Sequence, residues 1–205
     1  MVIDEEMKIE KYLNGNCTAI IILHEIYGVN DFVSGIGQRY HSEGFDVYCP
    51  NLYKTNTFFS YENSEEAYST FINEIGFEAY EKINKLVNEL KIIYQEVFII
   101  GFSVGATIAW KCSENESCDG VIGCYGSRIR DYLTVTPQCP VLLTFAKQDS
   151  FDVSAVADEL QNKKRVEIEI LDGKHGFVDM FSHNYSASHA QLFDQFRLKF
   201  LNKIK

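Results

Sequence analysis

The sequence lacks several features that would assign it to a specialised class of protein. None of its apolar runs approaches the length that spans a membrane. We expect no secretion signal at residues 1–6, because no basic segment is followed by an apolar run. It has no internal repeat and no linker rich in Pro or Gly. We therefore expect one domain over residues 1–205, a length sufficient for a sizeable core.

Basic residues are also scarce, with 19 Lys and Arg against 29 Asp and Glu, which gives a formal net charge of -10. This charge argues against nucleic acid or an anionic membrane as a partner, since both would repel the chain. The six cysteines form no Cys-x-x-Cys pair. Several lie in predicted strands, so reduced structural thiols in a cytoplasmic protein are favoured over disulfides.

Signals for a cofactor or a metal ion are missing as well. Gly35-Ile36-Gly37 lacks the third glycine of a dinucleotide fingerprint, and there is no Gly-Lys-Ser/Thr sequence. His183 and His189 lie near or on the last predicted helix without matched ligands. We therefore predict no cofactor and no metal site.

What the sequence does contain is a regular alternation of apolar strands and amphipathic helices. The strands are predicted at 19–23, 45–49, 97–100, 121–125, 141–146 and 166–171, and the helices at 31–41, 65–71, 78–93, from 105 onward, 153–161 and 187–202. Asp31 is placed to cap the first helix, and Phe193, Phe196, Phe200 and Leu201 should face the core from the last. This order predicts an α/β fold with a doubly wound, parallel sheet and helices on both faces. Residues 51–64 form a long polar and aromatic loop beside a pocket.

The centre of the chain carries Gly101-x-Ser103-x-Gly105 between a buried strand and a helix. A strand that passes into a helix so quickly must turn sharply, and the glycines leave room for that turn. The pattern alone is weak, because small residues recur at turns, but its position is typical of the nucleophile elbow of α/β-hydrolases. It predicts that the Ser103 hydroxyl is exposed at the start of a helix.

Two further reactive residues follow strands, Asp149 after 141–146 and His175 after 166–171. The carboxyl ends of parallel strands meet at one edge of a sheet, and Ser, Asp, His is the α/β-hydrolase order. His175 would act as the base for Ser103, and Asp149 would orient the imidazole. Asp152 and Asp172 are rivals for the carboxylate, and a histidine in a solvated loop is the alternative for His175.

An acyl-transfer site also needs donors for the oxyanion. The backbone N–H of Val104 would supply one, at the positive end of a helix. The loop after the first apolar strand would supply the second, at Ile26.

These positions resemble the dienelactone hydrolase family of α/β-hydrolases. The resemblance covers most of the chain, and its most specific part is the stretch from Glu25 to Asn30. The residues that carry it are His24-Glu25-Ile26-Tyr27-Gly28-Val29-Asn30, Cys49-Pro50-Asn51-Leu52-Tyr53, Glu66-Ala67-Tyr68, Gly101-Phe102-Ser103-Val104-Gly105, Gln148-Asp149 and Lys174-His175-Gly176-Phe177. The resemblance implies an α/β-hydrolase fold with a mostly parallel sheet and no lid domain, oxyanion donors at Ile26 and Val104, and Glu25 as an internal carboxylate near the nucleophile.

The chain departs from that family in two ways that bear on chemistry. Well-studied members use cysteine at the position of Ser103, where the internal glutamate helps to activate the thiol. The role of Glu25 here is therefore open between an auxiliary one and a structural hydrogen bond to the elbow. The members that cleave dienelactone present two arginines to the substrate carboxylate, at positions that align near Ser64 and at Asp179, so dienelactone is not the expected substrate.

The aromatic residues suggest what the site accepts instead. Tyr27, Tyr53, Tyr125 and Phe177 are expected to line a substrate pocket for an uncharged or apolar acyl or alcohol group. We therefore predict a monomeric or homodimeric serine hydrolase, an enzyme of the carboxylic ester type, that cleaves a small ester, lactone or thioester through an acyl-enzyme. The alternative is a catalytically degenerate member of the fold that binds a small molecule.

Overall fold

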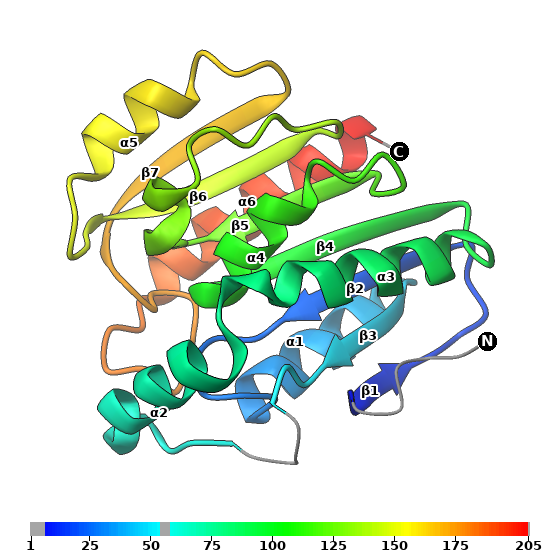
Figure 1. The fold of residues 1–205 in the computed structure, drawn as a ribbon, viewed down its shortest axis with the longest axis horizontal. Helices are drawn as coiled ribbons and strands as arrows, with labels where there is room; N and C mark the ends of the chain where they lie inside the picture. Colours follow the sequence, from blue (N-terminus) through cyan, green and yellow to red (C-terminus); the bar gives the residue numbers. More distant parts are fainter. Residues whose placement is uncertain (1–6, 54–57, 205) are drawn as a thin grey trace.

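The computed structural model describes residues 7–53 and 58–204, which form a layered α/β structure around one sheet (Figure 1). The sheet has seven strands in the order β1-β3-β2-β4-β5-β6-β7. They are β1 (Ile9–Tyr12), β2 (Thr18–Leu23), β3 (Asp46–Pro50), β4 (Glu96–Phe102), β5 (Gly120–Cys124), β6 (Val141–Gln148) and β7 (Val166–Lys174). Residues 1–6, and residues 54–57 of the predicted 51–64 loop, lie outside the described residues.

Helices cover both faces of the sheet (Figure 1). One core lies against α3 (Tyr80–Lys91), α4 (Val104–Cys112) and α5 (Val153–Leu160), and a second lies against α1 (Asp31–Ser42) and α6 (Ala187–Ile204). The shorter elements are η1 (Tyr61–Asn63), α2 (Ser64–Thr70), the π-helix η2 (Phe71–Ile75), η3 (Phe77–Ala79) and η4 (Ser127–Asp131). The predicted α/β-hydrolase architecture, with its mostly parallel sheet, is confirmed.

The apolar patterns of the sequence explain this layering. All six residues of β2 are buried, as expected of a central strand that is covered on both faces. α3 buries Ile83, Leu86, Val87 and Leu90 as the helical spacing predicts. α4 is buried along its whole length because it lies between the sheet and α3.

The structure differs from the prediction at four places. β1 was not predicted, and it pairs antiparallel with β3 at the edge of the sheet. The cap of α1 is Asn30 rather than Asp31, since the Asn30 side chain accepts a hydrogen bond from Val33 N–H. β7 extends to Lys174, beyond its predicted end at residue 171, so Asp172 lies within a strand.

The fourth difference concerns the inner face of α6. Phe196 packs against the core but is only partly buried, whereas the adjacent Arg197, which was not expected to face inward, is buried. The Arg197 guanidinium donates two hydrogen bonds to the Glu43 carboxylate, at 2.7 and 2.6 Å, and lies 4.7 Å from the centre of the Tyr40 ring. A buried charge is tolerated here because it is paired with Glu43 and also donates a hydrogen bond to Asp194.

The described residues include no helix that is both long and apolar enough to cross a membrane. All six cysteines are free thiols, and all of them except Cys17 are buried.

Candidate active site

Ser103 lies at the turn between β4 and α4, with φ 53° and ψ -115°. A positive φ at a residue with a side chain is energetically unfavourable and persists only where the surroundings impose it. Gly101 and Gly105 impose it through close backbone contacts. A Cβ atom at Gly101 would lie 2.2 Å from the Gly105 carbonyl oxygen, and one at Gly105 would lie 2.5 Å from the Leu23 carbonyl oxygen. Both glycines of the motif are therefore required by packing.

The fold brings Ser103, His175 and Asp149 into one hydrogen-bonded series. His175 follows β7 and Asp149 follows β6, the strand beside it. Nδ1 of His175 lies 2.8 Å from Asp149 Oδ2, and Nε2 lies 2.9 Å from Ser103 Oγ. The carboxylate accepts, so Nδ1 carries the proton and Nε2 is left to accept from the serine hydroxyl.

Asp149 is itself firmly held. Its side chain is only 4% exposed, and Oδ1 accepts hydrogen bonds from the Ser150 N–H at 2.6 Å and from the Ser150 hydroxyl at 3.1 Å. Burial acts to raise the pKa of Asp149, but the hydrogen bond and charge of His175 and the two Ser150 bonds outweigh it, so the pKa is lowered.

The same partnership raises the pKa of His175 above its ordinary value. Burial of the ring acts in the opposite direction, but the Asp149 hydrogen bond, the Asp149 charge and the Glu25 charge together prevail. The site therefore stabilises the imidazolium that would form when His175 takes a proton from Ser103.

The two rival carboxylates have other partners. Asp152 caps α5 by accepting from the Ala155 N–H at 3.0 Å, and Asp172 accepts from the Gln148 side chain at 3.3 Å.

A contact not anticipated from the sequence holds the backbone of His175. Asn184 Nδ2 donates to the His175 carbonyl oxygen at 2.9 Å. A single Asn in a loop carries no signal for such a contact.

The expected oxyanion donors lie on the wall of the same cavity. Ile26 and Val104 both line the space in front of Ser103. The Ile26 loop is fixed by His24, whose ring contacts the Glu25 carbonyl through Nδ1 and accepts from the Leu52 N–H through Nε2 at 2.9 Å. Burial lowers the pKa of His24 to about 4, so this ring is a neutral structural group.

The structure corrects the predicted substrate pocket, because three of its four aromatic residues are buried. Tyr53 stacks on His24 and donates to the Ile26 carbonyl oxygen, so it supports the oxyanion loop from behind. Tyr125 and Phe177 are fully buried, with the Tyr125 ring 4.9 Å from that of His175. Tyr27 is partly buried against Tyr61.

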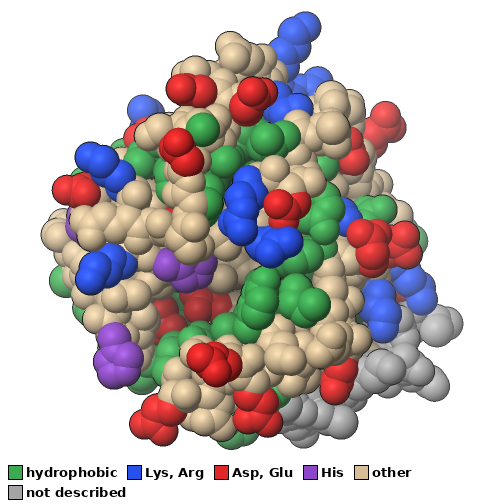
Figure 2. All heavy atoms as spheres, turned by 60° about the vertical axis from the view of Figure 1, so that its left-hand side comes forward, with side chains coloured by type: hydrophobic (Ala, Val, Ile, Leu, Met, Phe, Trp, Pro, Cys, Tyr) green, Lys and Arg blue, Asp and Glu red, His purple; other side chains and the backbone are tan. Residues whose placement is uncertain are grey.

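The cavity beside Ser103 has a volume of about 370 Å³, and its wall combines apolar surface with charged side chains. Tyr68 is its aromatic side chain, and Arg128 and Lys174 bring positive charge to it. The residues that line it are Ile26, Tyr68, Ser103, Val104, Ser127, Arg128, Gln148, Asp149, Ser150, Lys174, His175 and Asn184. Figure 2 shows a hollow in the surface with a histidine at its edge, acidic side chains within it, and basic and hydrophobic side chains across from the histidine. The expectation of an uncharged or apolar binding group no longer rests on those aromatic residues, and it stays a prediction.

Glu25 is a buried carboxyl group close to this site. Burial raises its pKa to about 7, the His175 charge opposes that rise, and the Asp179 charge adds to it. Its Oε1 has no hydrogen-bond partner in the described part of the chain. Asp179 is also fully buried and accepts a hydrogen bond from the Tyr61 hydroxyl. A carboxylate therefore occupies the position at which the resemblance would place an anion-binding arginine.

Residues 10–205 match the model of the dienelactone hydrolase family. The chain belongs to the dienelactone hydrolase family. It is 39% identical to the uncharacterized protein YczH of Bacillus subtilis strain 168, over 78% of this chain and 80% of that one. It is 26% identical to a carboxymethylenebutenolidase of Pseudomonas putida, over 89% and 84% of the two chains.

Solved structures of low sequence identity share the fold. A dienelactone hydrolase-like promiscuous phosphotriesterase from metagenomic libraries aligns with a TM-score of 0.76 at 14% identity, over 97% of this chain and 98% of that one. Est1E from Butyrivibrio proteoclasticus, with bound ferulic acid, aligns with a TM-score of 0.69 at 13% identity, over 98% and 99%. Family and fold together place this protein among the dienelactone hydrolase-like hydrolases.

Among the described residues, no three His, Cys, Asp or Glu side chains are grouped as a metal ion would require.

Proposed function

We propose that this protein is a serine hydrolase of the carboxylic ester type, which cleaves a small ester, lactone or thioester through an acyl-enzyme within one domain. The observation that carries the proposal is the unbroken series from Asp149 Oδ2 through the His175 ring to Ser103 Oγ, with distances of 2.8 and 2.9 Å. Each atom is within the reach that proton transfer requires.

The reaction follows from these contacts. Ser103 Oγ attacks the substrate carbonyl carbon while His175 Nε2 takes the hydroxyl proton, and Asp149 stabilises the resulting imidazolium. His175 then returns that proton to the leaving alcohol or thiol as its bond to the acyl carbon breaks. A water molecule attacks the acyl-Ser103 ester, with His175 as base again, and releases the acid and the free serine.

The oxyanion that forms in each half-reaction would be bound by the N–H groups of Val104 and Ile26. Val104 is the first residue of α4, where the helix dipole favours negative charge. Loss of one such donor typically costs about 3 kcal/mol of transition-state stabilisation.

The site favours substrates other than dienelactone, since Asp179 is a buried carboxylate that cannot pair with an anion. Arg128 and Lys174 lie elsewhere on the cavity wall. The Arg128 guanidinium is already engaged by Asp131 at 2.5 Å and by the Tyr68 hydroxyl at 3.3 Å. We therefore assign to the cavity a small ester, lactone or thioester other than dienelactone.

The proposal is tested by steady-state hydrolysis of 4-nitrophenyl esters, small lactones and acyl thioesters of graded size. Ser103→Ala should lower kcat/KM on the best substrate by roughly four to six orders of magnitude. Ser127→Ala, a serine on the same cavity wall, should retain activity within about tenfold. Near-parental activity of Ser103→Ala would reject the proposal, and absence of turnover on every class would favour a binding protein.

A further inference from the structure

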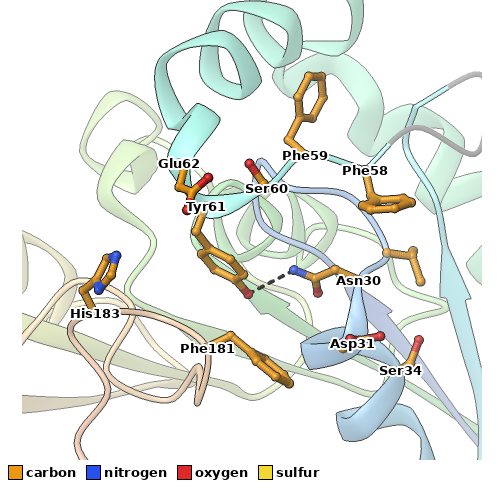
Figure 3. A pocket seen from close by; sticks show the side chains of 11 residues that line it. Asn30, Asp31, Ser34, Phe58, Phe59, Ser60, Tyr61, Glu62, Phe181 and His183 are labelled. Atoms are coloured by element: carbon orange, nitrogen blue, oxygen red, sulfur yellow. Dashed lines mark hydrogen bonds between the residues drawn. The ribbon is translucent and has the colours of Figure 1, made fainter.

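A second cavity, of about 610 Å³, lies beside the start of α1 and the segment that leads into α2 (Figure 3). Its wall has no residue in common with the cavity beside Ser103. Its volume falls within the range of about 300–1,000 Å³ that is usual for sites of small molecules. We propose that this cavity binds a small organic ammonium ion, with its apolar body between the rings of Phe58, Tyr61 and Phe181 and its charge at Asp31.

The aromatic part of the wall is partly exposed and partly fixed. Phe58 and Phe181 are 69% and 47% exposed, which leaves large apolar rings facing water. In Figure 3 the Tyr61 and Phe181 side chains lie on one side of the cavity, Phe58 lies across from them, and Phe59 points away. The faces of aromatic rings attract cations as well as apolar groups.

Tyr61 is held in place before any ligand arrives. Its hydroxyl accepts from Asn30 Nδ2 at 3.0 Å and donates to the Asp179 carboxylate, and its ring centre is 4.4 Å from that of Tyr27. A wall that is already ordered loses little entropy when a ligand binds.

The described wall of the cavity combines two carboxylates with one histidine, His183. Asp31 and Glu62 are exposed carboxylates on its wall, and neither forms an ion pair or a hydrogen bond with another described residue. Ser34, also on the wall, donates to Glu10. No Lys or Arg of the described residues lines the cavity. These groups favour a cation over an anion.

The helix end beside the cavity does not reverse this preference. The positive end of α1 would attract an anion, but the Asn30 side chain already accepts from the Val33 N–H. Asp31 adds a negative charge in the first turn. In Figure 3 Asp31 lies on the same side of Tyr61 as Phe58, whereas Glu62 lies on the other side, toward His183. Asp31 is therefore the carboxylate that meets the ammonium group.

The test is a pair of titrations, followed through backbone amide NMR shifts of the full chain at constant ionic strength. The probes are phenethylammonium and 2-phenylethanol, which differ in the charged group and share the aromatic body. We expect phenethylammonium to saturate shifts at residues 29–34, 58–62 and 181 with a Kd at least fivefold lower than that of the alcohol. A fivefold ratio of the two Kd values corresponds to the free energy of about one exposed ion pair or cation–π contact.

Matched variants identify the contacts. Asp31→Asn should remove the advantage of the amine, whereas Glu65→Gln, an exposed carboxylate outside the wall, should preserve it. Phe181→Leu should weaken both probes about threefold, and its exposed neighbour Met180→Leu should weaken neither. Ser103→Ala should bind as the parent does, so this result is independent of the proposed catalysis.

Several results would overturn the proposal. They are equal affinity for amine and alcohol, the absence of saturable binding, an unchanged preference in Asp31→Asn, or shifts that cluster around Ser127 and Asn184 of the other cavity.

Discussion

Replacement of Asp149 by Asn tests whether the Asp149 carboxylate determines the tautomer of His175. Asp149 Oδ1 faces two donors, the Ser150 N–H at 2.6 Å and the Ser150 hydroxyl at 3.1 Å. In the Asp149→Asn variant the amide oxygen of the new side chain would take that position, because an amide NH₂ there would face two hydrogens. The NH₂ group would then face His175 Nδ1, which now has to accept.

The size of the expected loss of activity follows from this change of tautomer. When Nδ1 accepts, the ring proton moves to Nε2, which can then no longer accept from the Ser103 hydroxyl at 2.9 Å. The imidazolium also loses its carboxylate partner. A substitution of this kind in a Ser-His-Asp triad lowers kcat by about 10⁴, or roughly 5.5 kcal/mol of activation free energy. We expect a loss of that order in kcat/KM for Asp149→Asn.

The assay compares three carboxylates that follow strand β6 or lie in β7. Asp152→Asn should retain kcat/KM within about threefold, because Asn caps a helix as well as Asp does. Asp172→Asn should do the same, because it loses only an exposed hydrogen bond to Gln148. Thermal unfolding of each variant separates a catalytic loss from a folding defect. A tenfold or smaller loss in Asp149→Asn, or an equally large loss in either control, would refute the reasoning.

Three further predictions concern Glu25 and the elbow. The Glu25 charge raises the pKa of His175, so Glu25→Gln should move the acid limb of the kcat/KM profile to lower pH, and a shift to higher pH would contradict this. The pKa of Glu25 is raised to about 7, so its contribution to stability is lost as the pH rises toward 7. The free energy of unfolding of Glu25→Gln, measured with denaturant, should therefore rise relative to that of the parent by up to about 3 kcal/mol between pH 4.5 and 8. A difference between the two proteins that does not change with pH would argue against this. Gly105→Ala should lower the free energy of unfolding by at least about 1–3 kcal/mol, because its Cβ would lie 2.5 Å from the Leu23 carbonyl oxygen. An unchanged unfolding midpoint would contradict this prediction and show that the turn can relax.

Much of the fold could be predicted because its central strands are covered on both faces. Continuous apolar runs such as the one in β2 have few other interpretations. β1 was missed because it is a four-residue edge strand, Ile9–Tyr12, with a charged residue at each of its two middle positions. The buried Arg197 was missed because pairing with Glu43 depends on an approach of α1 and α6 that neither helix encodes alone.

The positions of the reactive residues could be predicted, but the direction of the neighbouring side chains could not. The topology fixes which residues follow the strands, and so Ser103, Asp149 and His175 could be selected together. Tyr125 also follows a strand, yet it has φ 42° and a fully buried ring. Periodicity ends with the strand, so the first loop residue can point into the core or into the cavity. Side chains in these loops therefore could not be assigned to the pocket from the sequence, and Tyr53, Tyr125 and Phe177 prove to be buried.

The claim that Ser103 is a nucleophile activated by His175 is tested most directly by a fluorophosphonate probe on the folded protein, with the modified residue located by peptide mass spectrometry. The account predicts stoichiometric labelling of Ser103, which is lost on denaturation and slowed by at least about a hundredfold in His175→Ala. Absence of labelling across pH 6–9, or labelling of a different serine while Ser103 stays free, would contradict it.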